Sequence, residues 1–329
     1  MKNTMKKAGY YFCFLILIIL LSGCEKKEEA KTAEIYAMDT VMQITVYGEE
    51  KEKAVKEARK LIQKYDALWS SAGTNSDIRK INESAGEFVE VAPETYELLQ
   101  KSIAISEMTE GAFDVSIEPV VSLWGFDNKD YRIPDETKRK KAVQYVDYRK
   151  ILLREPNQIK IEKGMKIGVG GIAKGYTSNK LMETFRSMKV SAAIVSLGGN
   201  VETFGKKNTG ELFRVGITNP LSSDSLLGTI DLTDKAVITS GNYERYFEKD
   251  GVHYHHIIDR KTAAPAENDL SSVTVIGEDG TMCDGLSTAL FVMGKERALT
   301  FQKEHTEYDI ILVTKNGDVI STAKEFVLM

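Results

Sequence analysis

The sequence predicts an α+β fold: a single large domain in which mixed or antiparallel sheets are flanked by helices. Stretches with the alternation typical of strands outnumber stretches with helical spacing by roughly two to one, and the two kinds do not alternate regularly along the chain. In addition, 42% of the 329 residues are hydrophobic, which is enough for a substantial core. We expect the folded domain to span residues 35–329.

The first 23 residues have the features of a secretory signal. Three lysines precede an apolar run over 8–21, which is short for a membrane span. Leu21-Ser22-Gly23-Cys24 follows, with small residues before a cysteine, and this looks like a bacterial lipoprotein signal. We therefore expect cleavage before Cys24, a lipid on its sulfur, and a tether over 24–34 that holds the protein outside the cytoplasm on a bacterial membrane. The alternative is an ordinary anchor helix with a chance cysteine.

Charge and cysteine content restrict the partners of the domain. The formal net charge is −4, and loss of a signal with three lysines and no acids would make it −4 − 3 = −7. This balance argues against nucleic acid as a partner. Cys13 would leave with the signal and Cys24 would carry the lipid, so only Cys283 would remain. An intrachain disulfide is therefore excluded, and packing must stabilise the fold.

Apolar spacing predicts strands and helices in the first half of the domain. The segment 42–46 alternates as a half-buried strand does. Apolar residues over 54–69 recur every three or four positions, as on one face of a helix, and Pro93 opens a second helix that ends at Glu110-Gly111. Further strands are predicted near 88–91, 151–153 and 159–161, with a short helix inside the charge-rich excursion 128–148.

The aromatic stretch Leu123-Trp124-Gly125-Phe126 has two interpretations. It could form a wall for a planar ring, or it could fill the core. The stretch taken alone favours the core.

A glycine-rich segment runs directly into a predicted helix. It reads Gly168-Val169-Gly170-Gly171-Ile172-Ala173-Lys174-Gly175-Tyr176, and Leu181, Phe185 and Met188 mark the helix. Free backbone N–H groups and the dipole at such an N-terminus favour phosphate. The segment matches neither a Walker loop nor the dinucleotide fingerprint, so a phosphate site and an ordinary turn both stay open on spacing alone.

Two later strands end in turns where the backbone can approach a ligand. The strand 192–197 ends at Gly198-Gly199-Asn200, and the strand 236–239 ends at Ser240-Gly241-Asn242. The other strands of this half are predicted near 213–218, 228–232, 273–276, 310–314 and 319–322.

Three of the four histidines lie on a strand predicted over 252–259, after an Asp250-Gly251 turn. Alternation would send His253 and His255 to one face, and His256 to the other with Tyr254 and Ile258. This separation, and the lack of paired cysteines at ligand spacing, argue against a zinc cluster. A surface strand with polar histidines is the alternative to an active-site strand.

Asp284 and Thr288 are four residues apart on a helix predicted over 284–291, so they share one face. A carboxylate and a hydroxyl suit Mg²⁺, which prefers oxygen ligands and often also holds phosphates. The alternative is an Asp that caps the helix and a Thr that bonds back to a carbonyl. Because a cation near a helix N-terminus opposes the dipole, full ligation would need phosphate oxygens or another protein carbonyl.

Six motifs taken together resemble the ApbE family, which comprises FAD:protein FMN transferases. They occur in order from about Met38 to Gly294, nearly the whole mature chain, and are far more specific jointly than singly. The motifs are Thr109-Glu110-Gly111-Ala112-Phe113-Asp114, Gly170-Gly171-Ile172-Ala173-Lys174-Gly175-Tyr176, Leu197-Gly198-Gly199-Asn200, Thr239-Ser240-Gly241-Asn242-Tyr243-Glu244-Arg245-Tyr246, His256-Ile257-Ile258-Asp259 and Asp284-Gly285-Leu286-Ser287-Thr288.

The resemblance implies a T-fold-related catalytic domain and a reaction. FAD would bind with its diphosphate on Mg²⁺, a threonine or serine hydroxyl of an exported target protein would attack the FMN phosphorus, and AMP would depart. Targets of this kind include FMN-binding-domain subunits of redox-driven pumps. The resemblance further implies that the side chains of Asp284 and Thr288 and the carbonyl of Ala173 ligate the metal, and that His256 is the base.

The FAD-binding positions expected from these motifs lie in several separate segments. They are Met38, Ala112, Phe113, Asp114, Gly170, Lys174, Tyr176, Gly198, Gly199, Asn200, Thr239, Ser240, Gly241, Arg245 and Ile257.

The chain departs from the family pattern at three places. Gly168 stands where many members carry Asp, and Arg260-Lys261-Thr262-Ala263-Ala264 replaces the usual Asp-Pro-Arg-Thr-Gly ending after the shared Asp259. The loop 69–72 lacks an aromatic that some members use near the flavin. Two alternatives therefore stay open: a hydrolase that splits FAD into FMN and AMP with water, and a lipoprotein that only binds and presents flavin.

Overall fold

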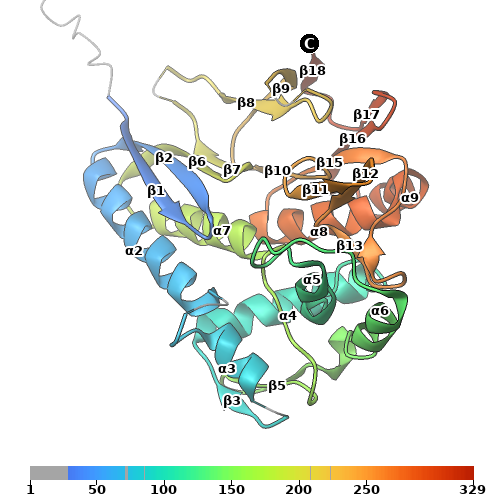
Figure 1. Ribbon diagram of the computed structural model, residues 1–329. Helices are drawn as coiled ribbons and strands as arrows, with labels where there is room; N and C mark the ends of the chain where they lie inside the picture. Colours follow the sequence, from blue (N-terminus) through green and yellow to red (C-terminus); the bar gives the residue numbers. More distant parts are fainter. Residues whose placement is uncertain (1–28, 71–72, 85, 208, 223) are drawn as a thin grey trace, which may run out of the picture.

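An eight-stranded sheet forms the centre of the protein, and each of its neighbouring strand pairs is antiparallel (Figure 1). The computed structural model describes residues 29–329 apart from 71–72, 85, 208 and 223, so the predicted signal and Cys24 lie outside the described residues. In spatial order the strands are β1 (Lys31–Ala37), β2 (Thr40–Gly48), β6 (Val190–Leu197), β7 (Asn200–Gly205), β10 (Ala236–Gly241), β15 (Leu270–Gly277), β16 (Asp309–Thr314) and β17 (Val319–Ser321).

Helices cover one face of this sheet (Figure 1). Every second residue of a strand points to that face, and the apolar side chains there pack against the helices. Against it pack α2 (Lys51–Trp69), α7 (Ala173–Arg186), α8 (Gly280–Met293) and α9 (Lys295–Glu304), with α4 (Pro93–Met108) behind α8. The peripheral elements on this side are α3 (Asp77–Glu83), α5 (Glu118–Trp124), α6 (Glu136–Val143), the 3₁₀ turn Tyr148–Lys150, β3 (Val89–Glu90), β4 (Leu152–Arg154) and β5 (Gln158–Lys160).

A second, smaller sheet packs on the opposite face. It contains β8 (Phe213–Thr218), β9 (Leu226–Leu232) and β18 (Phe326–Leu328) in the order β18-β9-β8. Its apolar side chains meet those of β10, β15 and β16 in a separate cluster that includes Val215, Ile217, Val237 and Ile311. The predicted α+β class is confirmed. In the described part of the chain, no helix is both long and apolar enough to cross a bilayer.

The histidine strand is shorter than predicted. It forms a hairpin of β11 (Tyr246–Lys249) and β12 (Val252–His255), and a separate pair, β13 (Ile258–Asp259) and β14 (Ala264–Pro265), follows. The prediction of one strand over 252–259 is wrong because the chain changes partner: β12 pairs with β11 as far as His255, whereas the Ile257 carbonyl accepts the Ala266 N–H and begins the pairing with β14.

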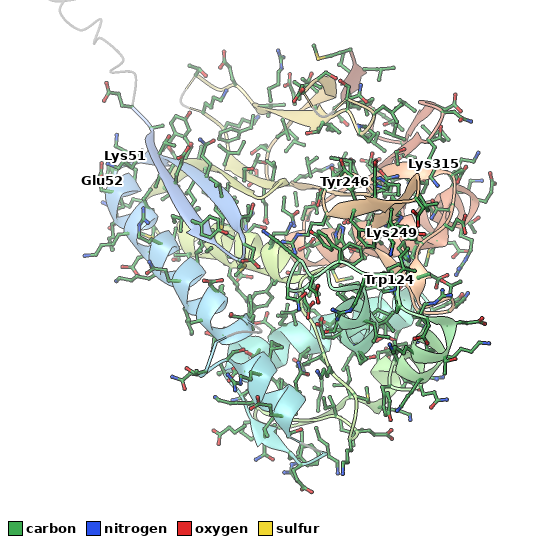
Figure 2. The ribbon with its side chains drawn as sticks, in the orientation of Figure 1. Lys51, Glu52, Trp124, Tyr246, Lys249 and Lys315 are labelled. Carbon is green, nitrogen blue, oxygen red and sulfur yellow. The ribbon has the colours of Figure 1, made fainter. Side chains whose placement is uncertain are left out.

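The predicted division of the hairpin into two faces is confirmed. Tyr254 and Ile258 pack with Trp124 and Phe126 beneath the hairpin, and Figure 2 labels Trp124 below Tyr246 and Lys249. On the other face the His253 and His255 rings are 6.4 Å apart. The aromatic stretch around Trp124 therefore fills a core, as the sequence favoured.

The helix that carries Asp284 begins four residues earlier than predicted. The side chain of Asp279 accepts the N–H groups of Thr281 and Met282, at 2.8 and 3.2 Å, so Asp279 rather than Asp284 caps α8. Asp284 therefore lies in the second turn. The predicted conflict between a bound cation and the helix terminus is correspondingly weaker, since the dipole acts mainly within the first turn.

Helices α7 and α8 approach each other closely at two glycines. A Cβ on Gly175 would lie 2.2 Å from the carbonyl oxygen of Gly280, and a Cβ on Gly280 would lie 2.4 Å from Oε2 of Glu202. Any larger residue at either position would push the helices apart.

Glu202 is a buried acid at this contact. The Ser178 hydroxyl oxygen lies 2.6 Å from Glu202 Oε2 and 3.0 Å from the Gly175 carbonyl oxygen. The hydroxyl has one proton and the carbonyl can only accept, so both contacts are satisfied when Glu202 is protonated and donates to Ser178. Burial raises the pKa of Glu202 to about 8, which agrees with this arrangement.

Glu202→Gln is expected to be more stable than the parent in mildly alkaline solution. Between the ordinary pKa of 4.5 and the folded value of about 8, the folded parent holds a proton that the unfolded chain has lost. Its free energy of unfolding therefore falls as pH rises through this window, by at most about 1.4 kcal/mol per pH unit from this group. Glutamine still donates to Ser178 but does not titrate.

Urea unfolding at about pH 5 and pH 8 measures this difference. Glu211→Gln serves as the control, because it removes the charge of an acid that is exposed rather than buried. A stability gain from Glu202→Gln that is equal at both pH values would contradict a protonated Glu202 in the folded state.

Candidate functional site

A cavity of about 500 Å³ opens between the end of the eight-stranded sheet and strand β8 above it. Six of the predicted FAD-binding residues line it: Met38, Lys174, Gly198, Gly199, Thr239 and Arg245. The expected FAD positions did not include Asp39, Thr40, Tyr243, Glu244 and the β8 residues 215–218, which also line it, although Tyr243 and Glu244 belong to one of the six motifs. The first four lie beside predicted positions, whereas β8 carries only the alternation of an ordinary strand.

Two tight turns at adjacent hairpins form one wall of the cavity. Met38 and Asp39 join β1 to β2 with φ of 48° and 58°, and Gly198 and Gly199 join β6 to β7 with φ of 60° and 93°. Positive φ at both central residues is typical of two-residue hairpin turns. A Cβ on Gly198 would lie 2.5 Å from Oγ1 of Thr40, so glycine is required where the two turns meet.

Two cations face this cavity. Lys174 follows the first residue of α7, and its Nζ lies 3.5 Å from the Gly198 carbonyl oxygen. Arg245 reaches the cavity from the segment before β11. An ammonium and a guanidinium beside a helix N-terminus suit a phosphate or diphosphate, and Glu244 and Asp39 partly balance their charge.

The predicted metal ligands gather around the start of α7. Oδ2 of Asp284 accepts the Gly175 N–H at 2.8 Å. Oγ1 of Thr288 lies 3.5 Å from the position that a Cβ on Gly171 would take and 3.3 Å from the Ser240 hydroxyl. Ala173, the first residue of α7, stands between Gly171 and Gly175, and its carbonyl accepts the Thr177 hydroxyl at 2.7 Å.

These donors fit a hard cation. Asp284 is 4% exposed, and its burial raises the pKa of the carboxyl, while Lys174 opposes that shift. A bound cation would favour the charged carboxylate further. Carboxylate, hydroxyl and carbonyl oxygens are the ligands that Mg²⁺ prefers. Over the described residues no group of three His, Cys, Asp or Glu is gathered, so a metal here would depend on such oxygens and on phosphate.

Asn200 adds an unsatisfied donor to the same region. Its side chain is 2% exposed, and its amide nitrogen has no hydrogen-bond partner among the described residues. The same amide lies close enough to Asp284 to lower the pKa of that carboxyl, although the contact does not meet hydrogen-bond geometry. A buried donor without a partner costs free energy that a ligand oxygen would recover.

His256 is not among the residues that line the cavity, but it is held in one tautomer by Arg245, which does line it. Its backbone N–H donates to the Arg245 carbonyl oxygen at 3.0 Å, and its Nδ1 lies 3.2 Å from the same oxygen. A carbonyl can only accept, so Nδ1 carries the proton and Nε2 carries the free lone pair. Burial, helped by the Arg245 cation, lowers the pKa of His256 to about 3. The ring is therefore neutral at physiological pH.

The other two histidines of this region have structural contacts. His255 is 6% exposed, its Nε2 donates to the Ala266 carbonyl at 3.1 Å, and burial lowers its pKa to about 4. His253 lies on the exposed side, where its Nε2 donates to the Asn242 carbonyl at 2.8 Å. The choice of His256 as the base among the three stays a prediction.

Comparisons with known proteins establish the family. The model of the ApbE family matches residues 38–312. The chain belongs to the ApbE family. It is 32% identical over 80% of its length to a FAD:protein FMN transferase of Klebsiella pneumoniae, covering 83% of that protein. It is 30% identical over 96% of its length to one of Treponema pallidum, covering 93% of it.

Solved structures agree with this assignment. The crystal structure of the ApbE protein of Thermotoga maritima superposes with a TM-score of 0.82 at 32% identity, over 89% of this chain and 97% of that one. The apo flavinyl transferase ApbE of Pseudomonas stutzeri gives 0.81 at 25% identity, over 90% and 95%. The predicted resemblance is thus confirmed.

Tyr176 does not lie in the cavity of this ApbE-family chain, so its predicted contact with FAD needs correction. Its side chain is fully buried, its hydroxyl donates to Glu97 at 2.7 Å, and its ring packs edge-on against Tyr65 and Trp69. The residue follows Gly175 on the helix, and the 100° step between neighbours turns it toward the core rather than toward the ligand.

Asp114 also has a structural environment. Its Oδ1 accepts the N–H and hydroxyl of Ser116, at 2.9 and 2.6 Å, and its Oδ2 accepts Arg260 at 3.0 Å and the Tyr148 N–H at 3.3 Å. With both oxygens occupied, Asp114 shapes the segment instead of offering a free carboxylate to the cavity. Other predicted FAD positions outside the cavity lining are Ala112, Phe113, Gly170, Asn200, Ser240, Gly241 and Ile257.

The departures from the ApbE pattern have local explanations. A Cβ on Gly168 would lie 2.3 Å from Oε2 of Glu118, so in this chain a carboxylate from α5 occupies the space beside the residue that replaces Asp. Burial raises the pKa of Glu118 to about 7. The altered loop after Asp259 is fixed by the Arg260 contact with Asp114. In the loop 69–72, positions 71 and 72 lie outside the described residues.

Proposed function

We propose that this protein is a FAD:protein FMN transferase, which moves FMN from FAD to a threonine or serine hydroxyl of exported target proteins and releases AMP. Family membership supports the reaction class. The observation that carries the proposal is the fixed tautomer of His256: its Nδ1 is bonded to the carbonyl of Arg245, a residue that lines the cavity. An imidazole with a free Nε2 beside two cations suits proton removal from a hydroxyl that attacks phosphorus.

Different residues of this chain would have different roles in phosphoryl transfer. Lys174 and Arg245 would hold the diphosphate of FAD, and Asn200 would donate to one of its oxygens. Mg²⁺, if held by Asp284, Thr288 and the Ala173 carbonyl, would supply neutralisation of the charge on the diphosphate. Binding in this orientation presents the FMN phosphorus to the acceptor hydroxyl, and placement of this kind accounts for most of the catalysis.

The proton follows a simple route. Nε2 of His256 takes it from the acceptor hydroxyl while the hydroxyl oxygen bonds to the FMN phosphorus. The bond between that phosphorus and the bridging oxygen breaks, and AMP leaves with the oxygen. FMN then remains on the acceptor as a phosphoester.

The charge of the bound substrate would change the pKa of His256. In the free protein the Arg245 and Lys174 cations help to lower the pKa of His256. A diphosphate bound to these cations offsets their charge, and a nearby anion favours the protonated imidazole. The pKa of His256 would therefore rise when FAD binds, which brings the base closer to the working pH.

We further propose that the protein is lipid-anchored through Cys24 to a bacterial membrane, outside the cytoplasm. The lysines, the apolar run and the small residues before Cys24 support this. Mass spectrometry of the membrane-extracted protein should find an acylated Cys24 as the first residue. An unmodified Cys24 within an intact N-terminus would overturn the anchor.

The reaction itself is tested with FAD, Mg²⁺ and a threonine-bearing acceptor protein. We expect AMP release and an acceptor that gains the mass of FMN, and we expect EDTA to abolish both until Mg²⁺ is restored. AMP and free FMN formed equally well without acceptor would instead identify a FAD pyrophosphatase. FAD binding with no AMP under any condition would identify a protein that only binds flavin.

His256→Ala is expected to retain FAD and to transfer FMN about a hundred- to ten-thousand-fold more slowly, because general bases typically contribute that much. Single-turnover transfer and FAD fluorescence titration measure the two quantities separately. His253→Ala, on the exposed face of the same hairpin, is the matched control and should transfer at the parent rate. A parent-like rate in His256→Ala would remove it from the role of base.

A further inference from the structure

The turn Met38–Asp39 is an unusual part of the cavity wall. Both residues have positive φ, 48° and 58°, although neither is glycine. The neighbouring turn of the same wall uses Gly198 and Gly199, which adopt this conformation without steric cost. Asp tolerates the left-handed region, but Met has no side-chain oxygen to compensate for it. The backbone at Met38 therefore requires an interaction from elsewhere in the protein.

Asp66 on α2 supplies that interaction. Its Oδ1 accepts the Met38 N–H at 2.8 Å, across 28 positions of sequence, in a partly buried environment. Ala37 pairs with Thr40 across the turn, so Met38 stands at a position whose N–H points out of the hairpin ladder. A carboxylate is a strong acceptor for such a group, because hydrogen bonds to charged acceptors exceed neutral ones in strength.

The side chain of Met38 is held by further contacts. It packs against the two apolar clusters below the sheet, and its sulfur lies 4.0 Å from the Thr177 hydroxyl of α7. Met38, Asp39 and Thr40 all line the cavity, whereas Asp66 does not. Asp66 thus contacts the binding wall from behind.

We propose that Asp66 is a positioning residue for FAD: it keeps the Met38–Asp39 turn in the left-handed conformation that shapes this wall of the cavity. The inference deepens the proposed function and rests on it, since FAD is the ligand whose binding the turn would govern. No role in proton transfer or metal binding belongs to Asp66, so its loss should change ligand affinity much more than the chemical step.

Asp66→Ala is expected to weaken FAD binding about tenfold, as loss of one hydrogen bond to a charged acceptor predicts. The rate of transfer at saturating FAD should stay within about twofold of the parent, because His256 and the proposed metal ligands are untouched. Asp66→Asn keeps an oxygen that can accept the Met38 N–H, so it should restore most of the affinity. Fluorescence titration with FAD and transfer at saturating FAD give the two readouts.

Glu57→Ala is the matched control. It removes one negative charge from the same helix, where Glu57 bonds to Lys60 within α2, and it should bind FAD as the parent does. If Asp66→Ala does not fold, Asp66→Glu replaces it, because the longer side chain keeps the charge but moves the oxygen away from the amide.

A double-mutant cycle with Met38→Gly tests the cause. Glycine adopts the left-handed conformation without help, so Asp66→Ala should weaken FAD binding by no more than about twofold in the Met38→Gly background. A tenfold loss in both backgrounds would show that Asp66 acts through its charge and would overturn the inference.

The outcomes separate the two proposals. A parent protein that neither binds FAD nor transfers FMN would contradict the proposed function itself. A parent that does both, with Asp66→Ala matching Glu57→Ala in FAD affinity, would contradict only the role of Asp66.

Discussion

The site depends on the close contact between the first turn of α7 and the second turn of α8. Gly175 and Gly280 allow the two backbones to approach, and the Gly175 N–H then bonds to the Asp284 carboxylate. This contact fixes a buried carboxylate at the beginning of a helix whose second residue, Lys174, faces the cavity. It also places Thr288, one turn further along α8, beside Gly171. A single packing interaction thus brings together the residues proposed to bind phosphate and the oxygens proposed to bind the metal.

The charged and titratable groups of the site lie close together and shift one another's pKa values. The free site holds a desolvated carboxylate, two cations and an imidazole whose pKa is lowered by burial and, to a smaller extent, by those cations. Each of these groups is costly when buried without a counter-charge. A diphosphate with a divalent cation would satisfy all of them together, since the cation favours the ionised Asp284 and the diphosphate balances Lys174 and Arg245. This charge pattern supports the proposal of a ligand that carries both signs of charge.

Local sequence signals predicted much of the fold and several parts of the site. The alternation around 42–46 matches β2, and the helical spacing over 54–69 matches α2. The predicted glycine turn, Gly198-Gly199, lies at the cavity. Prediction failed where the deciding contact comes from a distant element. The start of α8 is an exception, because its cap is local: Asp279, five residues before Asp284, accepts the N–H groups of Thr281 and Met282. Tyr176 resembled a ligand contact, but Glu97, Tyr65 and Trp69 hold it in the core.

The sequence by itself determined the family, the α+β class, and the residue types that the chemistry requires, because motif identity and apolar period are local properties of the chain. The tertiary structure alone decided which of those residues meet. It joined the Met38 turn to Asp66, placed β8 over the cavity and fixed the tautomer of His256 through the Arg245 carbonyl. It also left Asp114 and Tyr176 outside the cavity lining, with Arg260 and Glu97 as their partners. The physical reason is that hydrogen bonding and burial depend on neighbours far away in the chain, and no local pattern records which neighbours those will be.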